Sequence, residues 1–545
     1  MPTHERPSGR NLAPLLGLLL FGFSSSGLAT QVPLRDALEL CHLPNYRQEV
    51  LCGTHTVFED RARAQGREIT LHFAVLPAVG EEPLPDPLVV FAGGPGQAAR
   101  EMAAALGPML SEVREQRDIV LVDQRGMGAS HPLTCPGVID LDADEWNLDP
   151  EALRERTRDA ITHCLAEWDA DVSLYTQDLA NQDIHEIVTA LGYTRVNLYG
   201  GSWGTRSALL YAHQYPDQVR AVVLDGALPP SNPAPLYAAV DGERALRALF
   251  TDCAADTDCK AAFPDLEGTF RQAMERLGPE GIEVTVADPL TAESVDLRLT
   301  RETVGALLRN VLYVPELSRI VPWALSRAAE GDYRSLLGVS SFFNSATSGT
   351  MTLGATLAIF CAEEIARGDR MGLEIASEGE PLLGSAMLDG LRDGCAVWPE
   401  TSVPAIYDEA IGSQAPALVL SGDLDPITPP RWGEGMAELF PNGRHLVAPS
   451  TGHNVTPVGC APDLIAEFLE LADASALDAS CLEGIERPTF FVDVAGPAMV
   501  EASTTEEPVE PGVEDTETGD SETGDSETGG SETGGSETDS EGGDA

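Results

Sequence analysis

Residues 195–215 read RVNLYGGSWGTRSALLYAHQY, and this stretch decides the fold that we expect. Its first part, 195–199, is an apolar run typical of a buried strand, and the part after Ser202 has the periodicity of a helix. A G-x-S-x-G pattern at such a turn exposes the serine hydroxyl, and its two outer glycines allow a strained backbone and close helix packing. We therefore predict that Ser202 is a nucleophile; the alternative is a tight turn with an idle serine.

The segments around this turn alternate between strand and helix patterns. The predicted strands lie at 68–76, 87–91, 118–122 and 219–224, and the predicted helices at 97–116 and 179–191. Alternation of this kind implies right-handed crossovers between parallel strands. We expect an α/β protein with a mostly parallel central sheet and helices on both of its faces.

The pattern changes between 229 and 415, where periodicity is mainly helical and few runs have the character of buried strands. Strand-like runs return at 417–420 and 444–448. One sheet interrupted by an insertion explains this order most simply. We therefore predict a core formed by 30–228 and 416–490, with 229–415 as an inserted helical cap that shapes access to the site.

Both ends of the chain differ from this body. Two arginines, an apolar run and small residues make up 1–29, which is the pattern of a signal peptide. The apolar run is too short and too interrupted for a transmembrane anchor, so we expect export to the periplasm or the extracellular space. Residues 500–545 are an acidic tail that repeats SETGD and SETGG, and we expect it to be disordered and to lack a membrane anchor.

Charge excludes some classes of partner. The chain has 87 Asp and Glu against 34 Lys and Arg, a formal net charge of −53. Such a surface repels nucleic acids and anionic lipids and favours solubility. We therefore expect no nucleic-acid partner and no attachment to a membrane.

Ten cysteines, all beyond residue 29, suit an oxidising compartment. None of them forms a C-x-x-C pair, so zinc and thioredoxin-like chemistry have little support, and we expect no metal and no cofactor. Proximity in the sequence suggests five disulfides, namely Cys41–Cys52, Cys135–Cys164, Cys253–Cys259, Cys361–Cys395 and Cys460–Cys481.

A serine nucleophile needs a base, and the base needs an acid that orients it. In the α/β-hydrolase fold, which the nucleophile turn and the predicted sheet together indicate, the acid and then the histidine follow the serine on loops after later strands. Beyond the insertion the chain has His445 and His453. His445 falls inside the strand run, where we expect a core role. His453 follows that strand in a loop, and we predict that it is the base.

The acid should follow the strand at 417–420, where Asp423 and Asp425 both stand. Asp425 lies further along the loop and is held by Pro426, so it can reach the histidine loop, and we predict that it is the acid. Asp423 could instead bind backbone amides of its loop. A third candidate, Asp225, follows the strand before the insertion, where a role in forming the turn is more plausible.

Gly93-Gly94-Pro95-Gly96 directly follows the strand at 87–91. Glycines at this place let backbone N–H groups approach a reacting carbonyl, and the proline stiffens the turn. We predict an oxyanion hole formed by the N–H of Trp203, just after the nucleophile, and the N–H of Gly94.

Together these motifs resemble a known family. They are GGPG (93–96), DQRG (123–126), GGSWGT (200–205), GDLDPITP (422–429) and GHN (452–454). Their order and spacing are similar to the proline-iminopeptidase and tripeptidyl-aminopeptidase group of α/β-hydrolase serine peptidases, in particular its larger secreted bacterial members. The resemblance covers roughly 45–486 and gives Ser202, Asp425 and His453 the triad roles, whereas Asp123 and Arg125 look structural. Ala92 departs from the histidine of many iminopeptidases, which weakens the narrow iminopeptidase interpretation.

The resemblance implies an exported peptidase that removes residues or short peptides from free N-termini. Family members bind the substrate's ammonium group with acids of the cap, and Glu363 and Glu364 are candidates because a disulfide of Cys361 could hold them; the alternative is a pair of exposed helix acids. Two other functions remain open: an esterase or other small-molecule hydrolase with the same triad, and a catalytically silent binding protein of the same fold.

Overall fold

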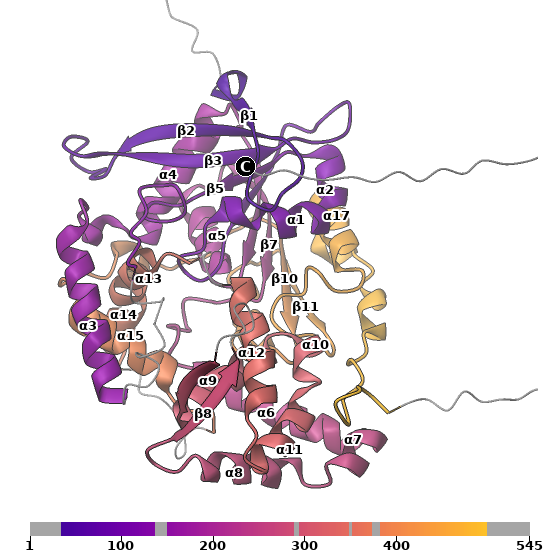
Figure 1. The fold of residues 1–545 in the computed structure, drawn as a ribbon. Helices are drawn as coiled ribbons and strands as arrows, with labels where there is room; N and C mark the ends of the chain where they lie inside the picture. The colour runs from indigo at the N-terminus through magenta and orange to yellow at the C-terminus, as the bar shows by residue number, and fades with distance from the viewer. Residues whose placement is uncertain (1–33, 137–149, 288–293, 348–350, 373–381, 499–545) are drawn as a thin grey trace, which may run out of the picture. The chain divides into compact units, whose positions relative to one another are not determined.

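A nine-stranded mixed sheet lies at the centre of the computed structural model, which describes residues 34–136, 150–287, 294–347, 351–372 and 382–498 (Figure 1). The strand order is β1 (Glu39–Cys41), β2 (Val50–Phe58), β3 (Glu68–Leu76), β5 (Ile119–Val122), β4 (Leu88–Phe91), β6 (Val196–Gly201), β7 (Val219–Asp225), β10 (Ala417–Gly422) and β11 (Gly443–Ala448). From β5 to β11 every pair of neighbours is parallel, and only β1, β2 and β3 add antiparallel pairs. The predicted α/β class and the mostly parallel sheet are confirmed.

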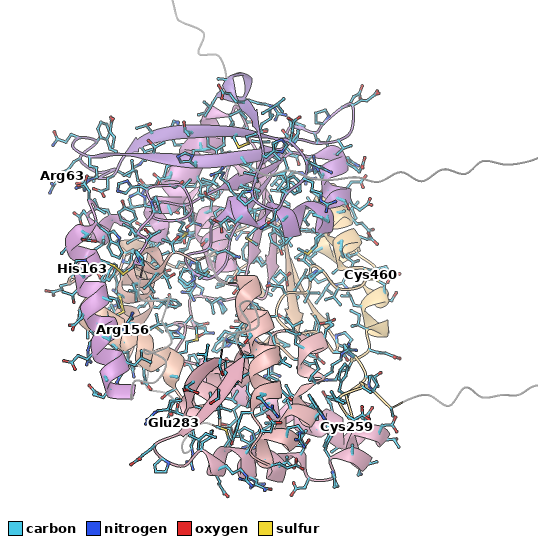
Figure 2. The ribbon with its side chains drawn as sticks, viewed as in Figure 1. Arg63, Arg156, His163, Cys259, Glu283 and Cys460 are labelled. Carbon is cyan, nitrogen blue, oxygen red and sulfur yellow. A yellow bond between two sulfur atoms is a disulfide. The ribbon has the colours of Figure 1, made fainter. Side chains whose placement is uncertain are left out.

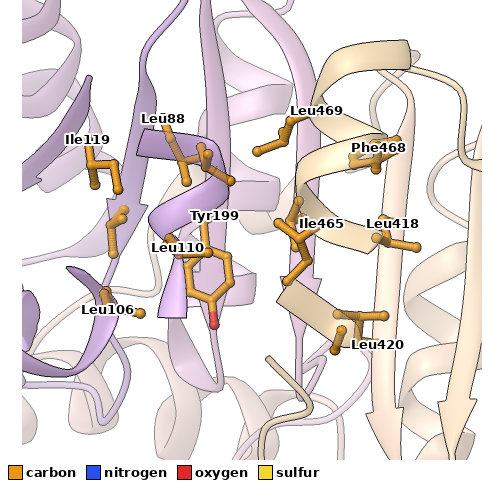
Figure 3. Packing of buried hydrophobic residues seen from close by; sticks show 14 of the residues in the cluster. Leu88, Leu106, Leu110, Ile119, Tyr199, Leu418, Leu420, Ile465, Phe468 and Leu469 are labelled. Atoms are coloured by element: carbon orange, nitrogen blue, oxygen red, sulfur yellow. The ribbon is translucent and has the colours of Figure 1, made fainter. Parts of the chain in front are cut away.

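Helices cover both faces of the sheet because its central strands are apolar on both sides. On one face lie α1 (Ala103–Met109), α2 (Ser111–Gln116) and α17 (Ala461–Leu471), whose buried side chains pack on Leu88 and Leu418 (Figure 3). On the other face lie α4 (Gln177–Ala190), α5 (Trp203–Gln214) and α16 (Pro430–Ala437), which pack on Val89 and Val419.

The helix predicted at 97–116 is broken in the structure. A short 3-10 helix, η2 (Ala99–Met102), precedes α1, and α1 ends at Met109, because its C-cap, Leu110, has a non-helical ψ of 28°. Pro108 in the last turn of α1 has no N–H to donate to the carbonyl of residue 104, so this helix lacks one of its hydrogen bonds near the break. Strands β1 and β2, which the sequence pattern did not indicate, extend the sheet beyond β3.

Strands β7 and β10 are neighbours in the sheet although residues 226–416 separate them in the sequence. The helices of this insertion are α6 (Ala238–Ala255), α7 (Thr257–Ala262), α8 (Leu266–Arg276), α9 (Arg301–Leu312), α10 (Pro315–Ser318), α11 (Val321–Ala329), α12 (Arg334–Thr347), α13 (Leu353–Ile359), the π-helix η5 (Phe360–Ile365), α14 (Ala366–Arg370), α15 (Ala386–Ala396) and η6 (Ala405–Asp408). An antiparallel hairpin of β8 (Ile282–Ala287) and β9 (Ser294–Leu299) adds a feature that the mainly helical pattern did not predict. Residues of α6, α8, α9 and α11 share a hydrophobic cluster of their own.

Outside the insertion, α3 (Pro150–Glu167) and η4 (Val172–Leu174) follow β5, and the chain's described part begins with η1 (Leu34–Ala37) and closes with η7 (Ala474–Ala476) and η8 (Ser480–Gly484). Arg158 of α3 forms an ion pair with Asp393 of α15 at 3.2 Å. The segment after β5 therefore packs against the insertion.

The ten cysteines form the five predicted disulfides, Cys41–Cys52, Cys135–Cys164, Cys253–Cys259, Cys361–Cys395 and Cys460–Cys481. Two of their members, Cys259 and Cys460, lie far apart on the molecule, so the cross-links are spread over it (Figure 2). Disulfides of this number are typical of proteins in oxidising compartments.

The predicted signal peptide and acidic tail lie outside the described residues. Within the described ranges, no helix is both long and apolar enough to span a bilayer, and no group of acidic, His or Cys side chains is arranged as a metal site.

Candidate active site

Ser202 occupies the sharp turn between β6 and α5, with a φ of 55° and a ψ of −122°. A positive φ is unfavourable for a residue with a side chain and is retained where the surrounding structure enforces it, often at functional sites. Gly200 and Gly204 make the turn possible, because a Cβ on Gly200 would lie 2.3 Å from the carbonyl oxygen of Gly204, and one on Gly204 would lie 2.0 Å from that of Phe91. The sequence therefore folds here into the strained turn that the G-x-S-x-G pattern predicts.

The loop after β10 and the loop after β11 bring an acid and a histidine together. The Nδ1 atom of His453 lies 2.8 Å from Oδ2 of Asp425, whose side chain is fully buried. Asp425 also accepts hydrogen bonds from the N–H groups of Ile427 and Thr428, both at 2.8 Å, and from the hydroxyl of Thr428 at 2.7 Å. These donors fix the carboxylate, so that it can orient the imidazole.

The electrostatics of this pair favour its charged form. Burial alone raises the pKa of Asp425, but the positive charge of His453 and the hydrogen bonds to the carboxylate outweigh it and leave the pKa below its usual value. Burial lowers the pKa of His453, and the charge and hydrogen bond of Asp425 outweigh that effect and raise it. Proton uptake by the imidazole is therefore easier than in water.

The two alternative acids have other surroundings. Asp423 lies on the same loop, and no described group donates a hydrogen bond to its Oδ1. Asp225 is completely buried at the end of β7 and accepts hydrogen bonds from the N–H groups of Val455 at 2.7 Å and Thr456 at 2.9 Å. Instead of only shaping its own turn, Asp225 holds the segment that follows His453. The sequence signal for this role is an acid at the carboxyl end of a buried parallel strand, next to the nucleophile strand.

The carbonyl oxygen of Asp225 joins the nucleophile turn to the histidine loop. It accepts hydrogen bonds from the N–H of Ser202 at 2.8 Å and from the side-chain amide of Asn454 at 3.0 Å. The next residue, Gly226, has a φ of +70°, and a Cβ there would lie 3.2 Å from Cε1 of His453. The imidazole therefore lies against the turn that begins at the end of β7, beside the strand that carries Ser202.

The glycine turn after β4 faces the nucleophile. A Cβ on Gly93 would lie 3.3 Å from the Cβ of Ser202, and Gly94 has a φ of +106° that favours glycine. Trp203 is the first residue of α5, so its N–H has no acceptor within the helix. The two N–H groups predicted to form an oxyanion hole thus belong to segments that meet at Ser202.

The other motif residues have structural partners. Asp123 accepts hydrogen bonds from the N–H of Arg100 at 3.0 Å and the N–H of Ala129 at 3.2 Å, which ties its loop to the segment after the glycine turn. Arg125 is buried and donates to Asp183 at 2.7 and 2.9 Å. His445 is partly buried and contacts the hydroxyl of Ser421 at 3.0 Å, as expected of a core histidine.

Glu363 and Glu364 are both buried in η5, so the alternative of exposed helix acids is wrong. Glu363 accepts hydrogen bonds from the N–H of Gln177 at 2.6 Å and from the hydroxyl of Tyr407 at 2.8 Å, and its burial raises its pKa to about 8. Glu364 forms ion pairs with Arg206 and, at 2.9 Å, with Arg367. Arg206 lies one turn after Ser202 on α5, so this pair connects the nucleophile helix to the insertion.

Two residues of the insertion contact Asp425 and His453, and the motif analysis did not find them. The carbonyl oxygen of Tyr313, just after α9, accepts the N–H of His453 at 2.9 Å, and the two rings meet edge to face with centroids 5.0 Å apart. Arg244 of α6 donates to the carbonyl oxygens of Asp423 at 2.9 Å and Asp425 at 2.6 Å. Neither residue belongs to a sequence motif. Each contacts a loop that is distant in the sequence, and a local pattern does not reveal such a contact.

Comparison with known proteins agrees with this fold. The family profile described as alpha/beta hydrolase fold matches residues 86–459. Serine protease Hip1 of Mycobacterium tuberculosis is 26% identical over 460 residues, which cover 77% of this chain and 85% of the relative. Tripeptidyl aminopeptidase of Streptomyces coelicolor is 23% identical over 480 residues, which cover 80% and 84%. Carboxylesterase B of Mycobacterium tuberculosis is 26% identical over 418 residues, which cover 71% and 77%. The chain is thus distantly similar to proteins named as peptidases and to one named as a carboxylesterase.

Proposed function

Because the chain belongs to the family of the alpha/beta hydrolase fold, we propose that it is a serine hydrolase, and more narrowly an exported peptidase that releases residues or short peptides from free N-termini. One observation carries the catalytic part of this proposal: Nδ1 of His453 lies 2.8 Å from Oδ2 of the buried Asp425. The loop of His453 is also held next to Ser202, because the carbonyl oxygen of Asp225 accepts hydrogen bonds from both the N–H of Ser202 and the side chain of Asn454. The peptidase part is supported by the relatives named serine protease and tripeptidyl aminopeptidase.

In the proposed mechanism, Nε2 of His453 accepts the hydroxyl proton of Ser202 while the serine oxygen attacks the carbonyl carbon of the scissile bond. Asp425 keeps the imidazole in the correct orientation and stabilises the imidazolium. The N–H groups of Gly94 and Trp203 stabilise the negative charge on the carbonyl oxygen. The imidazolium then gives its proton to the leaving amine, and an acyl-enzyme remains.

Water completes the reaction. His453 takes a proton from a water molecule, whose oxygen attacks the acyl carbon, and the serine leaves with that proton restored. The products are an N-terminal fragment with a new carboxylate and a shortened peptide with a new amine. The steps need no group beyond the chain, the substrate and water.

Recognition of the substrate's ammonium by Glu363 and Glu364 stays a prediction. Of the two, Glu363 is the better candidate, because two arginines already neutralise Glu364 whereas no cation pairs with Glu363 among the described residues. An ammonium group would favour the charged form of Glu363 against the effect of its burial.

The test compares three substrates that differ in one respect each. A tripeptide anilide with a free amine, its N-acetylated twin and a short-chain ester are given to the wild-type chain and to Ser202→Ala. We expect hydrolysis of the free-amine peptide at a kcat/KM at least ten times that of its acetylated twin, and no hydrolysis of any substrate by the variant. Equal rates on the acetylated twin and high rates on the ester would favour the esterase, which the similarity to carboxylesterase B supports.

Export is the remaining part of the proposal. The five disulfides and the charged, then apolar pattern of residues 1–29 support it. Mass spectrometry of the protein expressed in a bacterial host should find it outside the cytoplasm with its N-terminus at residue 30. A full-length chain with free thiols in the cytoplasm would contradict export.

A further inference from the structure

The insertion helix α13 lies directly against the glycine turn that follows β4. The hydroxyl of Thr356 donates to the carbonyl oxygen of Pro95 at 2.8 Å, and the N–H of Thr352 donates to that of Gly96 at 2.9 Å. The fit is close, because a Cβ on Gly96 would lie 2.1 Å from Oγ1 of Thr356. Two hydrogen bonds therefore fasten this turn to a segment that lies 261 residues further along the chain.

The turn has few side chains with which to hold its own shape. Three of its four residues, Gly93, Gly94 and Gly96, are glycines. Gly94 and Gly96 also have φ values of +106° and +110°, a region that favours glycine. A segment of this composition has many accessible conformations and keeps a single one only where its neighbours hold it. We therefore expect the bonds from α13 to fix the conformation of the turn.

Gly94, whose N–H is a predicted donor of the oxyanion hole, lies between two fixed points of this turn. On one side Gly93 lies against the nucleophile, since a Cβ there would be 3.3 Å from the Cβ of Ser202. On the other side α13 holds the carbonyl groups of Pro95 and Gly96. The direction of the Gly94 N–H relative to Ser202 thus depends on both contacts.

The hydroxyl of Thr356 has one proton and two carbonyl groups within reach. Its Oγ1 also lies 3.0 Å from the carbonyl oxygen of Thr352, in the preceding turn of the same helix. That oxygen already accepts the N–H of Thr356 at 3.0 Å, and the carbonyl of Pro95 is closer to the hydroxyl. The bond to Pro95 is therefore the contact that the hydroxyl adds between the insertion and the turn.

The same helical stretch also contacts the segment that carries the second predicted donor, Trp203. The backbone of α13 continues into η5 at Phe360 with helical angles. The ring of Phe360 lies near that of Trp203, with centroids 6.0 Å apart, and Glu364 of η5 pairs with Arg206 of α5. One stretch of the insertion thus contacts both segments whose N–H groups are predicted to form the oxyanion hole.

We propose that Thr356 is a positioning residue for the oxyanion hole: its hydroxyl holds the carbonyl of Pro95 and thereby keeps the N–H of Gly94 directed at the reacting carbonyl oxygen. This inference rests on the proposed serine-hydrolase function, and it gives the insertion a part in stabilising the transition state. Thr356 acts on the reaction through the backbone of the turn. Loss of its hydroxyl should therefore weaken stabilisation of the transition state and leave binding of the ground state unchanged.

Three variants isolate the hydroxyl from the rest of the side chain. Thr356→Ser keeps the hydroxyl, Thr356→Ala removes it, and Thr356→Val removes it but retains the branched shape. On the free-amine tripeptide anilide, we expect Thr356→Ala and Thr356→Val to lower kcat about 2- to 13-fold, the net worth of one hydrogen bond, with KM within about twofold of wild type. Thr356→Ser should keep kcat within about twofold of wild type.

A peptide aldehyde gives a readout that a purely structural role would not move. Ser202 adds to the aldehyde carbon, and the former carbonyl oxygen then occupies the place of the oxyanion, whereas the matching peptide alcohol binds without this addition. We expect the Ki of the aldehyde to rise in Thr356→Ala by about the factor by which kcat/KM falls, and the Ki of the alcohol to stay unchanged.

The matched control is Thr251→Ala on another helix of the insertion. The hydroxyl of Thr251 donates to the carbonyl of Arg247 within α6 at 2.9 Å and is exposed, so its loss should leave kcat, KM and both Ki values unchanged. If Thr356→Ala does not fold, the comparison of Thr356→Val with Thr356→Ser decides the question.

The outcomes separate this proposal from the function on which it rests. Wild-type kinetics in the variants without the hydroxyl, an equal loss in Thr356→Ser, or an equal loss of affinity for aldehyde and alcohol would overturn the role of Thr356 and leave the serine hydrolase in place. Full activity of Ser202→Ala, or equal affinity of the wild-type chain for aldehyde and alcohol, would contradict the proposed function and the inference with it.

Discussion

Tyr313 contacts His453 through both its backbone and its side chain: its carbonyl oxygen accepts the backbone N–H of His453 at 2.9 Å, and its ring meets the imidazole edge to face with centroids 5.0 Å apart. The backbone contact fixes the loop, and the ring contact restricts the tilt of the imidazole. A base that must reach both a serine and an acid depends on this orientation. The insertion thus takes part in placing His453.

Replacing this ring should slow catalysis without abolishing it. Tyr313→Ala removes the edge-to-face contact, which is worth about 0.5–1.5 kcal/mol, so kcat/KM should fall about 2- to 13-fold. Tyr313→Phe keeps a ring of the same shape and should stay closer to wild type. Steady-state kinetics on one peptide substrate decide this, and a larger loss in Tyr313→Phe than in Tyr313→Ala would contradict a role for the ring.

The two aspartates of one loop should differ sharply. Asp425→Asn keeps the shape of the side chain but cannot hold the imidazole in the productive tautomer, so kcat should fall by about 10⁴. Asp423→Asn is the matched control and should keep kcat within about threefold of wild type, because His453 pairs with Asp425 instead and the backbone groups of Ser450 and Thr451 that act on the Asp423 carboxylate can still bond to an amide oxygen. A comparable loss of kcat in both variants would show that activity depends on the loop as a whole and not on the pair of Asp425 with His453.

Activity should depend on pH through His453. Its pKa lies above the usual value of about 6.5, because the charge and hydrogen bond of Asp425 outweigh burial. Only the neutral imidazole accepts a proton, so kcat/KM should rise with pH and reach half its maximum above pH 6.5. In Asp425→Asn the residual activity should reach half its maximum at a lower pH, and an unchanged midpoint would contradict the assignment.

The same pair contributes to stability in a defined window. The raised pKa of His453 means that its charged form stabilises the fold fully below about pH 6.5 and that this contribution is lost as pH rises through the raised pKa. The lowered pKa of Asp425 adds stability above about pH 3.8 that is lost as pH falls through the lowered pKa.

The adjacent glutamates should differ in how much stability their neutralisation costs. Glu364→Gln leaves two buried arginines without their carboxylate and should lower the free energy of unfolding by about 3–5 kcal/mol. Glu363→Gln should cost less, because burial already raises the pKa of this carboxyl to about 8, so that the neutral form predominates at pH 7.

The signature of Glu363 is the pH dependence of stability. Its protonated form stabilises the fold below the usual pKa of about 4.5, and this stability is lost as pH rises to about 8. Urea unfolding at pH 5 and pH 8 should therefore show a larger fall in stability for the wild-type chain than for Glu363→Gln. Parallel curves for the two proteins would mean that Glu363 is already ionised in the fold.

Local patterns predicted the parts of the molecule that depend on neighbours in the sequence. The strand at 195–199, the turn at Ser202 and the pairing of His453 with Asp425 instead of Asp423 follow from periodicity, glycine spacing and the position of Pro426. The five disulfides join cysteines that are close in the sequence, and for that reason proximity was a sufficient guide.

Roles that arise between distant segments could not be predicted in this way. Asp225 serves a loop 230 residues later, and Tyr313 meets His453 only after the insertion has folded back. The burial of Glu363 depends on Gln177 and Tyr407, which belong to different parts of the chain. Each of these contacts arises from packing between distant segments, and periodicity along the sequence does not indicate which partner the residue meets.

The buried pair of Arg206 and Glu364 also limits how a substrate can reach the nucleophile. Arg206 further donates to the carbonyl oxygens of Leu228, Pro229 and Asn232, so one guanidinium fastens α5, the start of the insertion and η5 at a single point. Swinging this side of the insertion outward would break every one of these bonds and strand two charges in an apolar interior. A hinge at this point is therefore disfavoured, and we expect any opening of the insertion to occur where it is fastened less firmly.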